Sequence, residues 1–224
     1  MPGLSLVIAN KNYSSWSMRA WVLLRQAGIA FEEIPLKFSD DVKVMGIERY
    51  SPVGKVPVLL VDGQAVWDTL AIAETVAELF PDKALWPQDA SARRLARAAC
   101  AEMHSGFQNL RGRMPMNIRA LLPGRGMNAE VQRDVDRIVA LWRQCRQSRA
   151  AQAAGGAMLF GRFTIADAFF APVAMRFTTH AVAVPPDAAA YVAALRALPA
   201  VLEWMAAACR ETGFVAGDEP YAAP

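Results

Sequence analysis

The sequence predicts a mixed α/β domain followed by an all-helical domain, and three observations support this fold class. Residues 1–80 alternate short apolar runs with segments of helical periodicity. Between two of these runs, Asp62-Gly63 is a strong hairpin signal. The regular patterns after residue 90 are all helical. We therefore expect an α/β domain over residues 1–82, a proline-containing linker over 83–89 and a helical domain over 90–224.

The elements predicted for the first domain follow the order βαβαββα. Strands are expected over residues 4–9, 31–36, 56–61 and 65–67, and helices over 15–27, 40–50 and from 69 to just before Pro81. The pattern over 40–50 is polar and only weakly helical. A βαβ unit followed by a hairpin and a closing helix predicts a small mixed sheet flanked by helices.

The second domain is predicted to be a helical bundle. Ser91 is expected to cap a long helix, rich in alanine and arginine, that runs towards Arg113. Apolar residues then recur at helical spacing over 131–145, and further helices are expected from near Thr164 and over 198–205.

Composition excludes several classes of protein. The chain has 224 residues, 54% of them hydrophobic, yet no apolar run reaches the roughly 18 residues of a membrane helix. Its first residues lack the basic start and long apolar region of a signal peptide, so we expect a cytoplasmic protein with no membrane partner. The net charge of +3 comes with arginines spread along helical segments, which favours solvated helix faces over nucleic-acid binding. The three cysteines and two histidines show no metal-ligand spacing, so no metal is expected.

Two stretches lie where chemistry is favoured by local structure. Residues 12–21, NYSSWSMRAW, place serines where the first strand gives way to a helix N-terminus, and such positions stabilise anions, including thiolates. The ordinary alternative is that Ser14 or Ser15 only caps the helix. Val56-Pro57 begins a strand, where a cis bond would hold the backbone in an unusual and functionally useful geometry.

Four segments, taken in order, resemble the cytosolic glutathione transferases. They are SSWSMR, SPVGKVPVL, DTLAIAETV and FTIADAFFAPV, and the resemblance covers essentially the whole chain. The serine cluster is most similar to that of the zeta class, in which a cysteine usually stands where this chain has Trp16. The resemblance implies a thioredoxin-like N-terminal domain, glutathione as co-substrate, a homodimer and a role in detoxification. It also identifies Thr164-Ile165-Ala166-Asp167 as the family's capping box, which we assign to folding.

The resemblance implies a role for each residue of a glutathione site. In serine-type families the first serine of the cluster, here Ser14, donates its hydroxyl to the glutathione thiolate, and Ser15 is the alternative. A hydroxyl and a helix N-terminus together lower a thiol pKa by about one to two units from about 8.5. Tyr13 matches the donor of other classes but stands too close to the helix start.

The rest of glutathione is assigned in the same way. Lys55 occupies the position that contacts the glycyl end, unless it is an ordinary exposed loop lysine. Val56, before the family's cis-proline at Pro57, is expected to pair its backbone with the cysteinyl part. Asp68-Thr69 matches the family's Glu-Ser or Gln-Ser pair, with Thr69 facing the γ-glutamyl carboxylate and Asp68 the ammonium.

A small hydrophobic electrophile is expected to rest against the helical half. The candidate contacts are Trp16, Arg19, Met103, Phe107 and Arg176. Zeta-class enzymes use an arginine on the helix of Arg176, but the spacing does not match theirs closely, so we expect a surface salt bridge for this residue. Met103 and Phe107 recur at helical spacing, which favours ordinary core over a pocket lining for these two residues.

The leading hypothesis is therefore a glutathione transferase that activates the glutathione thiolate. One alternative is a zeta-like cis-trans isomerase, which would add the same thiolate reversibly to a maleyl-type diacid with help from Arg176 or Arg19. A thiol-transfer enzyme of the omega kind needs a cysteine at Ser14 or Ser15, and neither position has one. The last alternative is a non-catalytic interaction module of the same fold.

Overall fold

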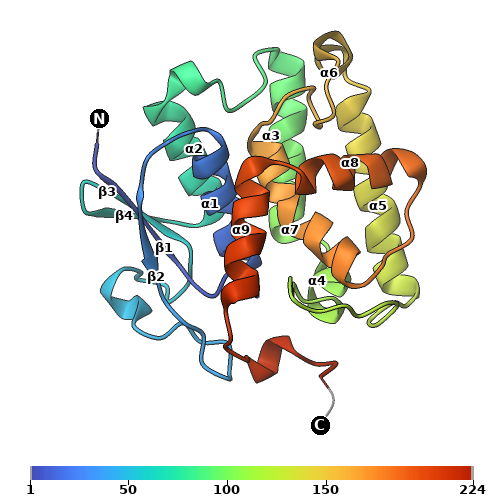
Figure 1. The fold of residues 1–224 in the computed structure, drawn as a ribbon. Coiled ribbons are helices and arrows are strands. Elements are labelled where there is room, and N and C mark those ends of the chain that lie inside the picture. Colours follow the sequence, from blue (N-terminus) through green and yellow to red (C-terminus); the bar gives the residue numbers. More distant parts are fainter. Residues whose placement is uncertain (1, 223–224) are drawn as a thin grey trace.

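The computed structural model describes residues 2–222 and places a four-stranded sheet beside a group of helices (Figure 1). In the first half the elements are β1 (Leu4–Ile8), α1 (Ser15–Gln26), β2 (Glu32–Pro35), η1 (Ile47–Arg49), β3 (Val58–Val61), β4 (Gln64–Trp67), α2 (Thr69–Leu79) and η2 (Pro81–Lys83). In the second half they are α3 (Ala90–Ser105), α4 (Gln108–Arg113), α5 (Ala129–Arg146), α6 (Arg149–Ala154), α7 (Ile165–Thr179), α8 (Pro186–Arg196), α9 (Pro199–Arg210) and η3 (Ala216–Asp218). The predicted fold class is confirmed.

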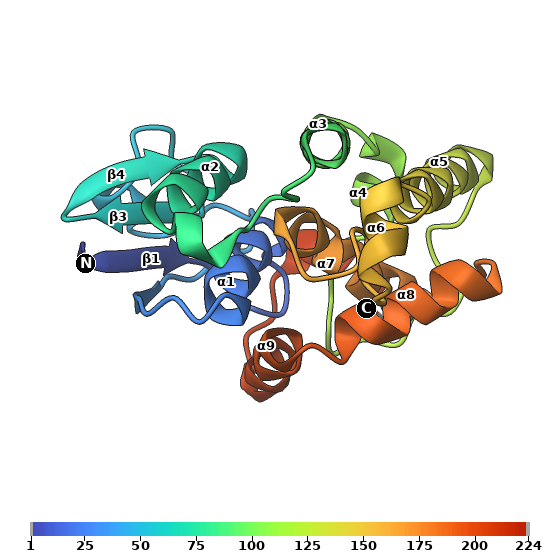
Figure 2. The same ribbon diagram turned by 90° about the horizontal axis from the view of Figure 1, so that it is seen from above.

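The sheet has the strand order β2-β1-β3-β4. β1 and β2 are parallel and are joined through α1, whereas β3 pairs antiparallel with both β1 and β4. The β3–β4 hairpin turns at Asp62-Gly63, as its sequence predicted. Figure 2 shows α1 and α2 beside the sheet, on the side that faces the helical half.

The two faces of the sheet are covered differently. Leu6 and Leu59 pack into the large core with α1 and α2, while Val7 and Val58 point to the other face. There the predicted helix over residues 40–50 is wrong. Its chain makes a bridge between Phe38 and Val44 and only one turn of 3₁₀ helix, η1, whose Ile47 covers Val7 and Val58. Only Ile47 of this turn is buried, and one buried apolar residue does not provide the apolar stripe that a longer helix would need.

The first helix of the second half is also shorter than predicted. It is capped by Asp89, whose carboxylate accepts from the Ala92 N–H at 2.8 Å, and not by Ser91. It ends before Gly106, and Phe107 with a φ of 58° separates α3 from α4. A left-handed residue cannot continue an α-helix, so the segment towards Arg113 is two helices.

Helix α7 is the centre of the molecule and packs on α1, α3 and α8. Its predicted capping box is confirmed, because the buried Asp167 carboxylate accepts from the Thr164 N–H at 2.8 Å and from its hydroxyl at 3.0 Å. The other carboxylate oxygen accepts from the Leu159 N–H and from the Tyr191 hydroxyl, both at 3.0 Å. One buried carboxylate thereby connects the start of α7 to α8.

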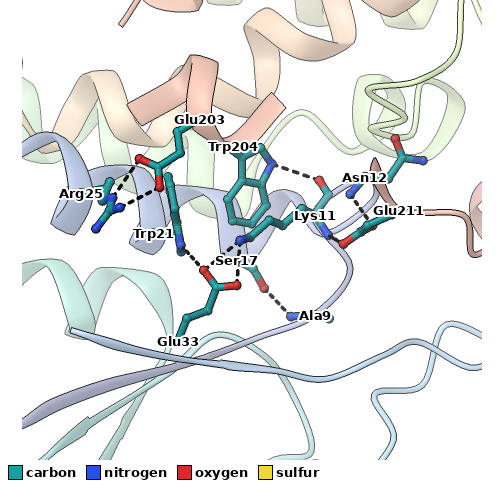
Figure 3. Close-up of polar contacts among 10 residues, drawn as sticks. All are labelled: Ala9, Lys11, Asn12, Ser17, Trp21, Arg25, Glu33, Glu203, Trp204 and Glu211. Carbon is teal, nitrogen blue, oxygen red and sulfur yellow. Dashed lines mark hydrogen bonds and ion pairs between the residues drawn. The ribbon is translucent and has the colours of Figure 1, made fainter. Parts of the chain in front are cut away.

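Helix α9 returns from the helical half to pack against α1 (Figure 3). The Trp204 indole donates to the Lys11 carbonyl at 3.0 Å, and the Lys11 ammonium pairs with Glu33 at 2.7 Å. Trp21 on α1 donates to the same Glu33 at 2.7 Å. Beyond α9, the Glu211 carboxylate accepts from the backbone N–H of Lys11 at 2.7 Å. The two halves therefore share polar contacts as well as apolar packing.

Within residues 2–222, no individual helix is long and apolar enough to cross a bilayer. Helices α8 and α9 reach that length and apolarity only when they are counted together, and they are bent by 74°.

Candidate functional site

A cavity of about 1020 Å³ lies beside the start of α1, and we call it the α1 cavity. Its walls come from the β2–β3 connection, the start of α2, the α3–α4 region, α7 and the segment after α9. The predicted residues found in its lining are Ser14, Ser15, Trp16, Lys55, Val56, Pro57, Asp68, Thr69 and Arg176. Segments far apart in the sequence thus bring most of the predicted site together.

The two serines differ in their hydrogen bonds. Ser14 is the N-cap of α1, and its oxygen accepts from the Ser17 N–H at 3.3 Å and lies 2.7 Å from the Ser17 hydroxyl. Ser15 is the first residue of α1, and its oxygen accepts from Nη2 of Arg176 at 3.2 Å. Both side chains are buried and line the cavity. The Ser14 oxygen is therefore engaged in capping α1. The Ser15 oxygen accepts one hydrogen bond from Arg176, so the Ser15 hydroxyl still has its proton to donate.

Arg176 is not on the surface, so the expectation of a surface salt bridge is wrong. Its side chain is 5% exposed, and its Nε donates to the Met114 carbonyl at 2.9 Å. Nη1 has no hydrogen-bond partner among residues 2–222. Burial lowers the pKa of this guanidinium to about 10, with a smaller contribution from Arg111, so it is still cationic at neutral pH. A buried cation with a free donor is therefore positioned in the cavity wall behind Ser15.

Trp16 is part of the cavity wall, and its ring contacts two guanidinium groups. Arg19 lies 4.2 Å and Arg111 4.7 Å from its ring centroid, distances typical of cation–π contacts. Arg111 lines the cavity, but Arg19 does not. Arg19 is 1% exposed behind Trp16 and also contacts the Phe169 ring, and burial lowers its pKa to about 9. The predicted contact of Arg19 with substrate is thus not met in this arrangement.

Met103 and Phe107 are likewise absent from the lining. Both belong to the large hydrophobic core, with exposed fractions of 0% and 7%. The buried side of α3 faces α7, which is why Met103 points inward. These two residues are structural in this arrangement.

Elsewhere in the lining, the bond between Val56 and Pro57 is cis, as the resemblance implied. Both residues precede β3, which begins at Val58, and Val56 is half-buried. Lys55 is exposed at the edge of the cavity, where its backbone N–H donates to the Ser51 hydroxyl at 3.4 Å. A backbone and a cation are thus available on this wall.

Asp68 and Thr69 form the third wall at the N-terminus of α2. Asp68 is the N-cap, with a φ of 75°, and one of its carboxylate oxygens accepts from the Leu70 N–H at 2.9 Å. The other oxygen lies 3.2 Å from Nε2 of His104 on α3. Nδ1 of the same imidazole lies 3.4 Å from the Thr69 hydroxyl. His104 also contacts Trp16 edge to face at 5.1 Å.

The segment after α9 contributes Asp218 to the cavity lining and contacts Tyr13. The Tyr13 hydroxyl donates to a Glu219 carboxylate oxygen at 2.6 Å and accepts from Arg119 at 2.9 Å. Burial and Glu219 both raise the pKa of this hydroxyl. Asp218 lines the cavity, and burial raises its pKa to about 6 although Arg176 acts in the opposite direction. Tyr13 is therefore engaged by this segment, which argues against a role as thiol donor.

The lining residues that sequence reasoning missed include His104, Arg111 and Asp218. His104 was available as a signal because the chain has only two histidines, but no local pattern connects it with Asp68. Arg111 is one of many arginines on helices, and Asp218 follows the last predicted helix. Among residues 2–222, no group of three or more His, Cys, Asp or Glu side chains is arranged to hold a metal ion.

Comparisons with known proteins agree with this geometry. Residues 13–79 match the model of the glutathione S-transferase N-terminal domain. The chain is similar to a probable maleylacetoacetate isomerase of Caenorhabditis elegans, with 34% identity over 96 residues, 43% of this chain and 44% of the relative. It is 33% identical to the maleylacetoacetate isomerase of Rattus norvegicus over 100 residues, 43% of this chain and 46% of the relative. The match thus spans less than half the length of these curated relatives.

Solved structures match over nearly the whole chain. A glutathione transferase homolog from Burkholderia GL BGR1 with bound glutathione has a TM-score of 0.70 at 24% identity, covering 91% of this chain and 97% of that one. A sphingomonad glutathione S-transferase complexed with glutathione has a TM-score of 0.63 at 20% identity, covering 92% and 100%. At these identities the structures establish the fold, which is thioredoxin-like in its N-terminal half. The chain therefore has the glutathione transferase fold, and its residues 13–79 match the N-terminal domain of the glutathione S-transferases.

Proposed function

We propose that this protein is a glutathione transferase that binds glutathione in the α1 cavity and presents its thiolate to a small electrophile. The observation that carries the proposal is the Ser15 hydroxyl, which lies in the cavity at the first turn of α1 and accepts from Arg176 at 3.2 Å. Two structures of the same fold hold glutathione, which supports this choice of ligand.

Three features of the cavity lining around Ser15 favour an ionised thiol. The Ser15 hydroxyl donates a hydrogen bond to the anion, the N-terminus of α1 contributes its partial positive charge, and the Arg176 cation polarises the hydroxyl from behind. Together they lower the thiol pKa by about one to two units, where each unit corresponds to about 1.4 kcal/mol. Ser15 is therefore our choice of donor, and Ser14 acts mainly as the cap of α1.

The remaining walls suit the rest of the tripeptide. Lys55 supplies a cation for the glycyl carboxylate, and the Val56 backbone pairs with the cysteinyl residue beside Pro57. Thr69 donates to the γ-glutamyl carboxylate at the N-terminus of α2, and Asp68 accepts from the ammonium. Trp16 and Arg176 then border the space left for the electrophile. The homodimer and the detoxification role are proposals that rest on the family resemblance.

A second candidate is the glutathione-dependent cis-trans isomerisation of an unsaturated diacid. It is favoured by Nη1 of Arg176, which is buried in the cavity wall with no partner among residues 2–222. A buried cation with a free donor suits a substrate carboxylate. The relatives named as maleylacetoacetate isomerases support the same choice. The thiolate would add to the double bond and leave after rotation about the resulting single bond.

Glutathione binding tests the proposed function directly. We expect calorimetry to give a dissociation constant below about 1 mM, the range in which weak cofactor sites lie. The ultraviolet absorbance of the bound thiolate should titrate with a pKa about one to two units below that of free glutathione. Absence of binding at millimolar glutathione would overturn the enzyme and favour a non-catalytic interaction module.

Arg176 provides a test of the second candidate. We expect the wild type to prefer a maleyl-type diacid over its dimethyl ester by about tenfold or more in kcat/KM, because one charge-assisted hydrogen bond is lost with the ester. Arg176→Met should abolish this preference. The ratio of kcat/KM for the diacid to that for the ester isolates the carboxylate contact, since any effect through Ser15 is common to both substrates. A preference retained in Arg176→Met would contradict the assignment, as would a wild type that does not distinguish the two substrates.

A further inference from the structure

His104 connects the two residues that we assign to the γ-glutamyl end of glutathione. Its Nε2 lies 3.2 Å from the Asp68 carboxylate and its Nδ1 lies 3.4 Å from the Thr69 hydroxyl. All three residues line the α1 cavity. Both ring nitrogens are therefore committed, and the proton on each nitrogen determines what its neighbour can do.

In the neutral imidazole only one nitrogen carries a proton. A carboxylate accepts and does not donate, so the proton must lie on Nε2 towards Asp68. Nδ1 is then an acceptor, and the Thr69 hydroxyl donates its single proton to it. In this state Thr69 has no proton left for a ligand carboxylate.

In the protonated imidazolium both nitrogens are donors. Nε2 keeps its contact with Asp68, and Nδ1 now donates to the Thr69 oxygen. The Thr69 hydroxyl is released and can donate to a carboxylate placed at the N-terminus of α2. Only the contact with Thr69 changes its direction between the two states.

We propose that His104 is a positioning residue that sets the donor state of Thr69, so that binding of the glutathione γ-glutamyl carboxylate is coupled to uptake of one proton by His104. This inference rests on the proposed function, in which the α1 cavity binds glutathione. It adds a proton-linked step that depends on a residue of the helical half, since His104 belongs to α3.

Charged groups on three other elements act on His104. Burial lowers the pKa of His104, Asp68 at the start of α2 raises it, and Arg19 on α1 and Arg111 on α4 lower it further, so that its pKa lies below the usual 6.5 in the free protein. A bound carboxylate favours the imidazolium and raises this pKa. Between the His104 pKa of the free protein and that of the complex, the affinity for glutathione should therefore increase as the pH falls. Above the His104 pKa of the complex, the affinity should not change with pH.

S-methylglutathione is the probe of choice because its sulfur does not ionise. Between about pH 8 and about pH 5.5 we expect its Kd to fall by about tenfold, the size of one charge-assisted hydrogen bond. Calorimetry in two buffers of different ionisation enthalpy should show uptake of up to about half a proton within this range, the maximum for the one-unit rise in the His104 pKa that a tenfold change in Kd requires. These measurements need no catalytic turnover.

Two variants separate positioning from a structural role. His104→Gln keeps a donor for Asp68 and an acceptor for Thr69, so it reproduces the neutral imidazole. Its affinity should equal that of the wild type at high pH and should not change with pH. Thr69→Val removes the hydroxyl and should also abolish the pH dependence. Either variant alone tests the proposal if the other is poorly folded. Asp218→Asn is the matched control, because Asp218 lines the cavity with a pKa of about 6, and this variant should retain the dependence.

Three results would overturn the inference. They are a wild-type Kd that does not change with pH, a His104→Gln variant with the wild-type slope, and a slope lost only in Asp218→Asn. Each of these leaves glutathione binding itself intact. If S-methylglutathione fails to bind at every pH, the proposed function fails together with the proton coupling, and the two kinds of failure are thus distinguishable.

Discussion

Replacing Ser15 by alanine should lower kcat/KM for thiol conjugation about five- to tenfold at pH 6.5, because loss of the hydroxyl raises the thiol pKa by about one unit and removes most of the thiolate. The variant loses the hydroxyl that accepts from Arg176 in the cavity wall. Steady-state kinetics with a chromogenic electrophile measure the loss in rate, and the absorbance of bound thiolate measures the pKa. Both should change together, since one contact causes both effects.

Ser14→Ala is the informative comparison for this experiment. It removes the cap of α1 and should cost about 1 kcal/mol of stability, with activity retained to within a few-fold. Ser148→Ala, at the N-cap of α6 and outside the cavity lining, controls for loss of a capping serine in general. A large loss of activity in Ser14→Ala with little change in Ser15→Ala would assign the thiolate contact to Ser14.

Replacing Asp167 by alanine should destabilise the protein by about 4 kcal/mol, the scale for removing a buried and multiply bonded carboxylate. The change leaves the Thr164 and Leu159 N–H groups and the Tyr191 hydroxyl without their acceptor inside the protein. Chemical denaturation at pH 7.5 is the appropriate measurement, because burial raises the pKa of this carboxyl to about 6 and it is ionised there.

Asp89→Ala provides the matched control for Asp167. Asp89 also caps a helix, but its side chain is exposed and accepts a single backbone bond, from Ala92. We expect it to cost about 1 kcal/mol, the ordinary value of an N-cap. Equal losses in the two variants would contradict the special role assigned to the buried carboxylate.

The sequence was most informative where local chemistry determines the structure. The Asp62-Gly63 hairpin and the capping box at Thr164 were predicted correctly because each depends on a few neighbouring residues. The helix predicted over residues 40–50 failed for the opposite reason. This segment is held by the bridge between Phe38 and Val44 and by packing of Ile47 under the sheet, contacts that no local pattern encodes.

The site shows the same limit at the level of single side chains. Consecutive helical residues point about 100° apart, so Met103 enters the core while His104 reaches Asp68. Helical spacing alone did not indicate which side of α3 faces the cavity. Arg176 was placed on its helix by sequence, but its contact with Ser15 joins residues 161 positions apart and depends on the packing of α1 against α7.

The contacts of Lys11, Trp21 and Trp204 in Figure 3 have a consequence for cooperativity. Helix α9 lies against α1, and its Trp204 donates to the backbone just before that helix. Separating the two halves would expose the Trp21–Trp204 aromatic contact and leave the indole of Trp204 without its acceptor. The N-terminal half is thus not an independently folding unit, and the two halves should unfold in one transition rather than as independent domains.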